Sequence, residues 1–210
     1  MADFSAPWTL TGSGLIIPFL LDSDYKNTHF PGWSGRLAMM MFVKYVSSPV
    51  GSYSEWMFVP GKRVNPRGKH FSVDQIRVDS QLSVDCGQQN WGIPKQLANF
   101  NIEQTKSNWH MEVRENLGNV VAKGRLLGPS IPIHSAILPF SLYQFWQGEH
   151  YWTKPVAKGT GRLFKLESLS VTGDHFPDIS TQTRLPAVAI SNFTMTFPTA
   201  EHFNCGRTTH

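Results

Sequence analysis

Apolar and polar side chains alternate most clearly over residues 108–116, which contain Trp109, His110, Met111, Glu112, Val113 and Arg114 in that order. Successive side chains of a β-strand point to opposite sides, so this alternation predicts a strand with one buried and one exposed face. A turn is expected at residues 117–119. Residues 120–127 then predict the returning strand of a hairpin.

Shorter runs of the same kind occur along the rest of the chain. We expect further strands over residues 36–46, 53–59, 71–79, 100–104, 162–171 and 188–197. The 14 prolines and 17 glycines are spread along the sequence, which favours many turns between short elements. This number of short strands in 210 residues predicts a barrel or a sandwich.

Helical patterns are sparse. Residues 80–89 and 137–147 each predict one short helix, and neither looks like the crossover of a repeating strand–helix–strand unit. Proline and glycine at 129–139 and 154–161 predict long loops. We find no internal repeat and no clear linker, so we expect a single domain over residues 1–210, of the α+β class and mainly β.

Charge and hydropathy exclude two classes of partner. The formal net charge is only +4, and the 19 lysines and arginines are scattered, whereas nucleic-acid binders concentrate them. The longest apolar stretches, at 15–21 and 37–43, are far shorter than the ~20 residues of a membrane span. The N-terminal MADFSAPW lacks the order of a signal peptide, and Cys86 and Cys205 form no CxxC pair. We therefore expect a cytoplasmic protein that binds neither nucleic acid nor membranes.

Most signatures of metal and nucleotide sites are also missing. The sequence has no phosphate-binding glycine loop, no GxSxG elbow and no HExxH motif. Of the eight histidines, only His202 has a spacing to a cysteine, Cys205, that resembles a metal site, and this pair lies near the chain end. We expect no metal and no cofactor.

One segment stands apart, the run GQQNWGIPKQLANF at residues 87–100. It resembles the G-R-x-x-W-G-x-P-K-x-x-A segment of acetoacetate decarboxylase-like proteins. Upstream, PVGSYSE at 49–55 resembles the P-x-G-x-Y-x-E element of the same family, and NFTMTFP at 192–198 is similar to its closing strand. The resemblance covers roughly residues 30–200.

This resemblance implies a fold, an activity and a set of site residues. The fold would be an antiparallel, cone-like β-barrel with few short helices. Lys95 would form an imine with a small-molecule keto substrate, and Glu55 would handle protons beside that imine. Trp91 would line the substrate pocket, and Tyr53, one pleat from Glu55 on the same strand face, would either line it or simply pack.

Such chemistry needs a neutral lysine. An ordinary lysine, with a pKa near ~10.4, is neutral in only about one part in a few thousand at pH 7. In acetoacetate decarboxylase itself, burial or a second cation performs the activation. Here Trp91, Ile93, Pro94 and Leu97 could build an apolar wall, so we expect burial to depress the pKa of Lys95.

Three positions depart from the family pattern. Gln96 stands where the decarboxylase has a second lysine, Gln88 where an arginine is usual, and the run of Met39 to Met41 where another pocket glutamate is found. We expect Gln88, Gln96 and Met40 to contact a substrate other than acetoacetate. Decarboxylation of a β-keto acid, aldol condensation with dehydration, and non-catalytic binding of a small molecule all stay open, as does assembly into a homo-oligomer.

Overall fold

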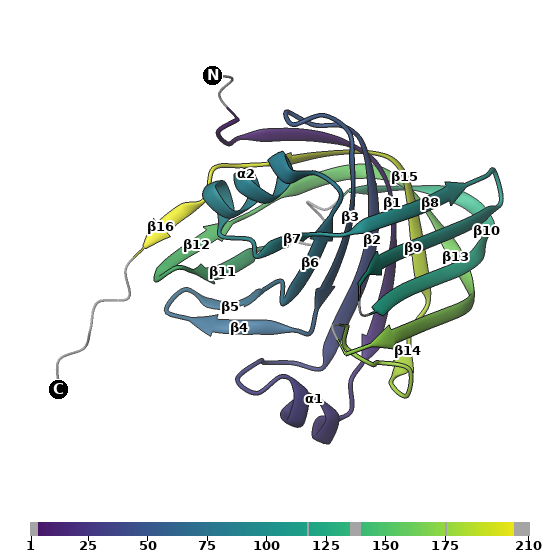
Figure 1. The fold of residues 1–210 in the computed structure, drawn as a ribbon, viewed down its shortest axis with the longest axis horizontal. Helices are drawn as coiled ribbons and strands as arrows, with labels where there is room; N and C mark the ends of the chain where they lie inside the picture. Colours follow the sequence, from purple (N-terminus) through teal and green to yellow (C-terminus); the bar gives the residue numbers. More distant parts are fainter. Residues whose placement is uncertain (1–3, 117, 135–139, 175, 204–210) are drawn as a thin grey trace.

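The structure is a computed structural model, and it describes residues 4–116, 118–134, 140–174 and 176–203. Two β-sheets dominate it, together with two short helices (Figure 1). The mainly β fold expected from the alternation of side chains is confirmed.

The larger sheet has 11 strands and forms a nearly closed barrel. Ten of them follow the order β7-β6-β3-β2-β1-β15-β13-β10-β9-β8, and β14 pairs with β1. Their bounds are β1 (Trp8–Leu20), β2 (Leu37–Ser47), β3 (Tyr53–Val59), β6 (Gln75–Val78), β7 (Lys95–Leu97), β8 (Asn99–Gln104), β9 (Asn108–Glu115), β10 (Gly118–His134), β13 (Val156–Gly173), β14 (Thr183–Arg184) and β15 (Ala187–Phe197).

The chain itself links the two ends of this sheet. Strand β7 pairs with β6 at one end, and β8 pairs with β9 at the other. Only Ala98 separates β7 from β8, and its amide donates to the carbonyl of Val78 on β6 (2.9 Å). The two end strands of the sheet are therefore consecutive in the chain and joined by a single residue. Lys95 is the first residue of β7, one of these two strands.

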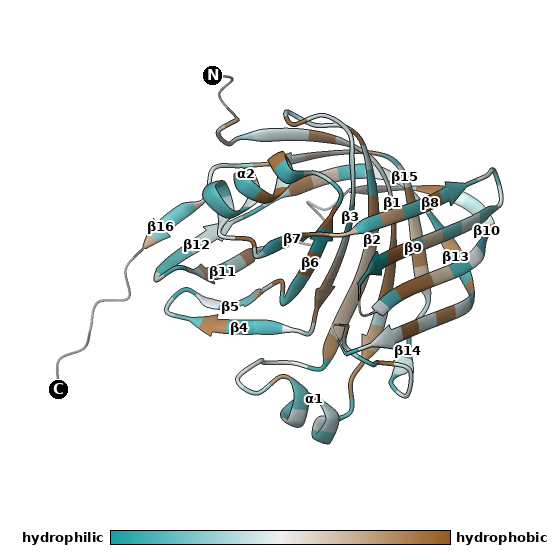
Figure 2. Ribbon diagram, viewed as in Figure 1, coloured by the Kyte–Doolittle hydropathy of each residue, from teal (hydrophilic) through white to brown (hydrophobic). Residues whose placement is uncertain are grey.

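A smaller, five-stranded sheet lies beside the barrel, on the left in Figure 1. Its order is β16-β12-β11-β5-β4, with bounds β4 (Lys62–Asn65), β5 (Gly68–Phe71), β11 (Leu142–Trp146), β12 (Glu149–Thr153) and β16 (Glu201–Phe203). Helix α2 (Gln81–Trp91) contacts β12 of this sheet and β6 and β7 of the barrel. Helix α1 (Ser23–His29) buries no residue and is mostly hydrophilic, whereas the barrel strands carry most of the hydrophobic stretches (Figure 2).

The two faces of strands β2 and β3 bury different cores. Even-numbered side chains, such as Phe42 and Trp56, face the barrel interior together with β9 and β13. Odd-numbered side chains, such as Tyr45 and Tyr53, face the space between the barrel, α2 and the smaller sheet. Because both faces are apolar, these strands are nearly continuous hydrophobic runs in the sequence.

Several expected elements are confirmed. The hairpin predicted over 108–116 and 120–127 is formed by β9 and β10, although Leu117 of its turn lies outside the described residues. The helix predicted over 80–89 is α2, and the Ser80 hydroxyl caps it by accepting the amide of Ser83 (3.3 Å). The strand predicted over 71–79 is interrupted, because β5 ends at Phe71 and β6 begins at Gln75.

Other expectations are wrong. The helix predicted over 137–147 lies partly outside the described residues, and the remainder contains strand β11. The described parts of the two predicted loops belong largely to the long strands β10 and β13. The ladder between these strands shifts register between Leu127 and Ile131, which accommodates a proline that cannot donate a hydrogen bond. Strand β1 and helix α1 were not expected at all.

Candidate active site around Lys95

Helix α2 and the turn after it place Lys95. Gly92 ends the helix in the left-handed conformation (φ 60°), and its amide donates back to the carbonyl of Gln88 (2.9 Å). A β-carbon at Gly92 would lie 2.4 Å from Cδ2 of Tyr151, so no larger residue fits there without movement. The chain then turns through Ile93 and Pro94 and enters β7, where Lys95 pairs in parallel with Ile76.

The ammonium of Lys95 lies among three oxygen atoms. Nζ is 2.7 Å from Oε2 of Glu55, donates to Oγ of Ser83 (3.0 Å) and reaches the hydroxyl of Tyr53 (3.5 Å). Lys95 is only 4% exposed and Glu55 only 3%. The two residues therefore form a buried ion pair, which is uncommon for lysine and glutamate.

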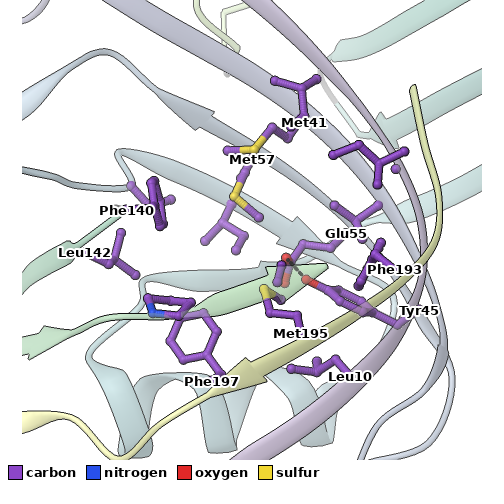
Figure 3. A pocket seen from close by; sticks show the side chains of 18 of the residues that line it. Leu10, Met41, Tyr45, Glu55, Met57, Phe140, Leu142, Phe193, Met195 and Phe197 are labelled. Atoms are coloured by element: carbon purple, nitrogen blue, oxygen red, sulfur yellow. Dashed lines mark hydrogen bonds between the residues drawn. The ribbon is translucent and has the colours of Figure 1, made fainter. Parts of the chain in front are cut away.

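Glu55 is held from its other side by Tyr45. The hydroxyl of Tyr45 donates to Oε1 of Glu55 (3.0 Å), the contact drawn as a dashed line in Figure 3. Tyr45 and Tyr53 pair across β2 and β3, and their ring centroids are 4.6 Å apart. A lysine, a carboxylate and two phenols thus make one connected polar cluster.

Burial and charge oppose each other at Lys95. Burial alone lowers its pKa, but the carboxylate of Glu55, supported by Tyr53, raises it more, so the pKa of Lys95 lies above its ordinary value. The expectation of a depressed pKa is therefore wrong for this arrangement, because it counted the apolar wall and left out the contact with Glu55. Burial also raises the pKa of Tyr53 to about 12, and that of Tyr45 well above its usual range.

The stem of Lys95 packs against a glycine of α2. A β-carbon at Gly87 would lie 2.7 Å from Cδ and 2.8 Å from Cε of Lys95. Contacts this short do not occur between real atoms of this kind, so any larger residue at position 87 would displace the lysine side chain. The glycine that opens the sequence motif therefore makes room for its lysine.

The polar cluster forms one wall of an apolar cavity of about 330 Å³. In Figure 3, Met41 and Met57 lie in the upper part of this space, Phe140 and Leu142 at its left, and Leu10 and Phe197 below. The lining comes from both sheets and from α2, and includes Trp8, Leu10, Ile16, Met41, Val43, Tyr45, Tyr53, Glu55, Met57, Val59, Val73, Ile76, Trp91, Ile93, Lys95, Phe140, Leu142, Lys158, Ile190, Phe193, Met195 and Phe197.

The structure brings together four of the residues singled out in the sequence. Lys95, Glu55 and Tyr53 are in contact, and Trp91 lines the same cavity while its indole Nε1 donates to the carbonyl of Pro198 (2.7 Å). Trp91 also packs against Trp8, with centroids 5.0 Å apart. Trp91 is thus fixed in place as part of the wall.

Three other expected residues lie elsewhere. Met40 is fully buried in the barrel interior, because it is one residue out of step with the cavity-lining Met41. Gln96 is exposed, since it follows Lys95 in a strand and points to the opposite side. Gln88 is half-buried on α2 and donates its amide to the backbone carbonyl of Lys95 (3.0 Å), so it supports the turn from outside the lining.

Sequence reasoning missed two residues that contact the ion pair, Tyr45 beside Glu55 and Ser83 beside Lys95. Tyr45 continues the odd-numbered face of β2 that includes Met41 and Val43, so a correct phase for that strand would have found it. Ser83 lies four residues before Gly87 on α2 and therefore on the same helix face. Recognising Ser80 as the helix cap would have placed Ser83 towards the lysine.

The described residues contain no group of three histidine, cysteine or acidic side chains arranged to hold a metal ion, although Cys205 lies outside them. In the same part of the chain, no helix has the length and apolar character needed to cross a bilayer.

The fold and the site together define a class of protein: a mainly β barrel with a buried lysine–glutamate pair in the wall of an apolar cavity. Comparisons place this fold among known ones. No family model and no curated protein matches the sequence. Solved structures do match it.

An acetoacetate decarboxylase from Legionella pneumophila subsp. pneumophila aligns with a TM-score of 0.70 at 12% identity, over 96% of this chain and 90% of that one. An acetoacetate decarboxylase-like enzyme from Sphingomonas wittichii RW1 gives 0.72 at 11% identity, over 97% and 94%. The enduracididine biosynthesis enzyme MppR, in complex with the condensation product of pyruvate and imidazole 4-carboxaldehyde, gives 0.61 at 10% identity, over 94% and 89%.

At these identities the likeness is one of fold. The resemblance seen in the sequence is confirmed to that extent: this is a divergent chain with the acetoacetate decarboxylase-like fold. The three neighbours are themselves described as enzymes or decarboxylases, but a shared fold alone assigns no role to this chain.

Proposed function

We propose that this protein is a Schiff-base enzyme in which Lys95 forms an imine with a keto substrate. The observation that carries the proposal is the contact between Nζ of Lys95 and Oε2 of Glu55 (2.7 Å) in the wall of an apolar cavity. Buried ionisable pairs are costly to maintain, and they concentrate at functional sites.

The raised pKa of Lys95 means that the amine must lose a proton before it reacts. Glu55 is in contact and is the group that would accept it. A substrate that expels water from the cavity strengthens the effect of burial, which disfavours both charges and favours a neutral amine beside a neutral acid. Glu55 would then return the proton to the carbinolamine oxygen, which leaves as water.

Once formed, the protonated imine is an electron sink. In decarboxylation, the bond between the carboxylate and the neighbouring carbon breaks, its electrons move into an enamine, and carbon dioxide leaves. In aldol chemistry, Glu55 takes a proton from the carbon next to the imine, and the resulting enamine attacks a second carbonyl compound. Both routes use the same two residues and need no cofactor.

Trapping with borohydride tests the proposal. With a ketone and borohydride we expect a stable mass increase on Lys95, located by peptide mass spectrometry and absent from Lys95→Ala. Lys95→Arg should fail as well, because a guanidinium stays protonated and cannot form this imine. Equal labelling of the exposed Lys69 or Lys154 would mean that Lys95 has no special reactivity.

The raised pKa of Lys95 favours a second candidate, a barrel that binds a small molecule without covalent chemistry. In that case the ion pair would stay charged when a ligand binds, and the ligand would rest on the apolar wall alone. A ketone that binds the cavity but leaves no adduct on Lys95 after borohydride treatment would establish this alternative.

A further inference from the structure

The cavity wall carries few charges. Among its described lining residues only Glu55, Lys95 and Lys158 carry a formal charge at neutral pH. Glu55 and Lys95 neutralise each other through direct contact. Lys158 is exposed to solvent on β13, where its charge is hydrated, so none of the described lining residues places an unpaired buried cation beside the ion pair.

Side-chain hydrogen-bond donors near the lysine are also engaged. The Tyr45 hydroxyl donates to Glu55, and the Trp91 indole donates to the carbonyl of Pro198. The Tyr53 hydroxyl interacts with both Lys95 and Ser83. A carboxylate placed beside Lys95 would therefore meet the like charge of Glu55 and find no free side-chain donor among the described lining residues.

The rest of the wall suits an apolar body. Three methionines, Met41, Met57 and Met195, line the cavity together with aromatic rings such as Phe140 and Phe197 (Figure 3). Methionine side chains are flexible and polarisable, so they adapt to flat or branched hydrocarbon groups. The volume of about 330 Å³ falls at the lower end of the range of small-molecule sites.

We propose that the substrate is an uncharged ketone with an aryl or alkyl body, and that the site discriminates against a carboxylate next to the reacting carbonyl. This inference rests on the proposed imine at Lys95, and it selects the aldol route over decarboxylation. The second reactant is then an aldehyde, which is also uncharged.

The reaction balances without an oxidant or a reductant. The Lys95 amine adds to the ketone and water leaves, giving an iminium ion. Glu55 removes a proton from the neighbouring carbon, and the resulting enamine forms a carbon–carbon bond to the aldehyde carbon, whose oxygen takes up a proton. The same carbon then loses its second proton while the hydroxyl is protonated and leaves as water, which gives an unsaturated iminium ion, and hydrolysis releases an enone and the free amine.

The test compares two ketones that differ by one carboxylate, 4-phenylbutan-2-one and freshly prepared 3-oxo-5-phenylpentanoate. Borohydride-trapped adduct on Lys95 is measured against concentration for each. We expect half-saturation by the neutral ketone at a concentration at least tenfold lower. Equal or tighter trapping of the charged ketone, or catalysed release of carbon dioxide from it, would overturn the inference and leave the imine chemistry standing.

Failure of the imine chemistry gives a different result. If neither ketone adds to Lys95, the proposed function fails, and binding is followed instead by fluorescence of the lining residues Trp8 and Trp91. Tighter binding of the neutral ketone would still support the selectivity, and equal binding would overturn it. Lys158→Gln serves as the control: tight binding of the charged ketone that is lost in this variant would show that the carboxylate is held at Lys158.

Discussion

The two faces of strands β2 and β3 share one backbone and one register, yet they should differ in the effect of side-chain substitutions. On the even-numbered face, Met40 and Phe42 have no exposed side-chain surface and belong to the interior of the barrel. The odd-numbered face, with Met41 and Val43, borders the cavity and continues to Glu55. One residue along a strand therefore separates a position that stabilises the fold from one that shapes the site.

The greatest loss of activity should follow from a change at Glu55, the charged end of the cavity face. In Glu55→Gln the amide keeps the shape of the side chain and removes the base, so turnover should fall by about 10²–10⁴-fold. Steady-state kinetics, without borohydride, on a ketone that forms the adduct in the trapping experiment would measure this turnover. Unchanged turnover would remove Glu55 from the proposed mechanism.

The same variant should also change how stability depends on pH. In the wild type the pKa of Lys95 is raised, so its stabilising contribution is present below the ordinary lysine pKa and is lost as pH rises through the folded value. In Glu55→Gln only Tyr53 still opposes the effect of burial on Lys95, so this pKa should fall, and the penalty of about 3–5 kcal/mol for a buried charge without its partner shrinks as pH rises. Denaturant unfolding of both proteins from pH 7 to 10 should show a narrowing gap, and a constant gap would contradict this assignment of charges.

Neighbouring methionines offer a matched pair for the two faces. Met40→Ala removes a fully buried side chain and should lower the free energy of unfolding by about 2–5 kcal/mol, while ligand affinity of the folded protein changes little. Met41→Ala removes a half-buried side chain that lines the cavity, so it should cost about 1 kcal/mol or less and weaken binding of an apolar ketone. Equal losses of stability would show that the cavity face is packed as tightly as the interior.

The sequence predicts the mainly β fold better than it predicts where the individual strands begin and end. Alternation over residues 108–116 locates a real hairpin because one of its sides faces solvent and the other the core. Strand β1 alternates only over residues 8–11; further along, Leu15 and Ile16 are apolar on both faces, and two glycines and a proline lie within the strand. Proline also concealed the long β10, where a register shift absorbs the break in the ladder.

The candidate site was predictable where a local motif carries it. The motif that contains Lys95 and the element that ends in Glu55 meet in space, as their resemblance to the decarboxylase family implies. The charge state of Lys95 was not predictable, because it depends on a contact between residues 40 positions apart. Gln96 and Met40 are misplaced for a simpler reason: each is one residue out of phase with the cavity face.

A smaller loss of reactivity is expected from helix α2, which packs against the stem of Lys95. Gly87→Ala puts a methyl group where Cδ and Cε of Lys95 lie, which should displace the amine from Glu55 and Ser83 and slow trapping by about tenfold, or about 1.4 kcal/mol in the activation free energy. Glycine is also a poor residue inside a helix, by about 1 kcal/mol relative to alanine, so the substitution strengthens α2 while it crowds the lysine. Unfolding experiments should therefore show a change in stability of less than about 1 kcal/mol despite the loss of reactivity.

The exposed Gln89→Ala on the same helix is the control and should leave trapping unchanged. If Gly87→Ala traps ketones as fast as the wild type, the close packing of α2 against the lysine stem has no part in placing the amine.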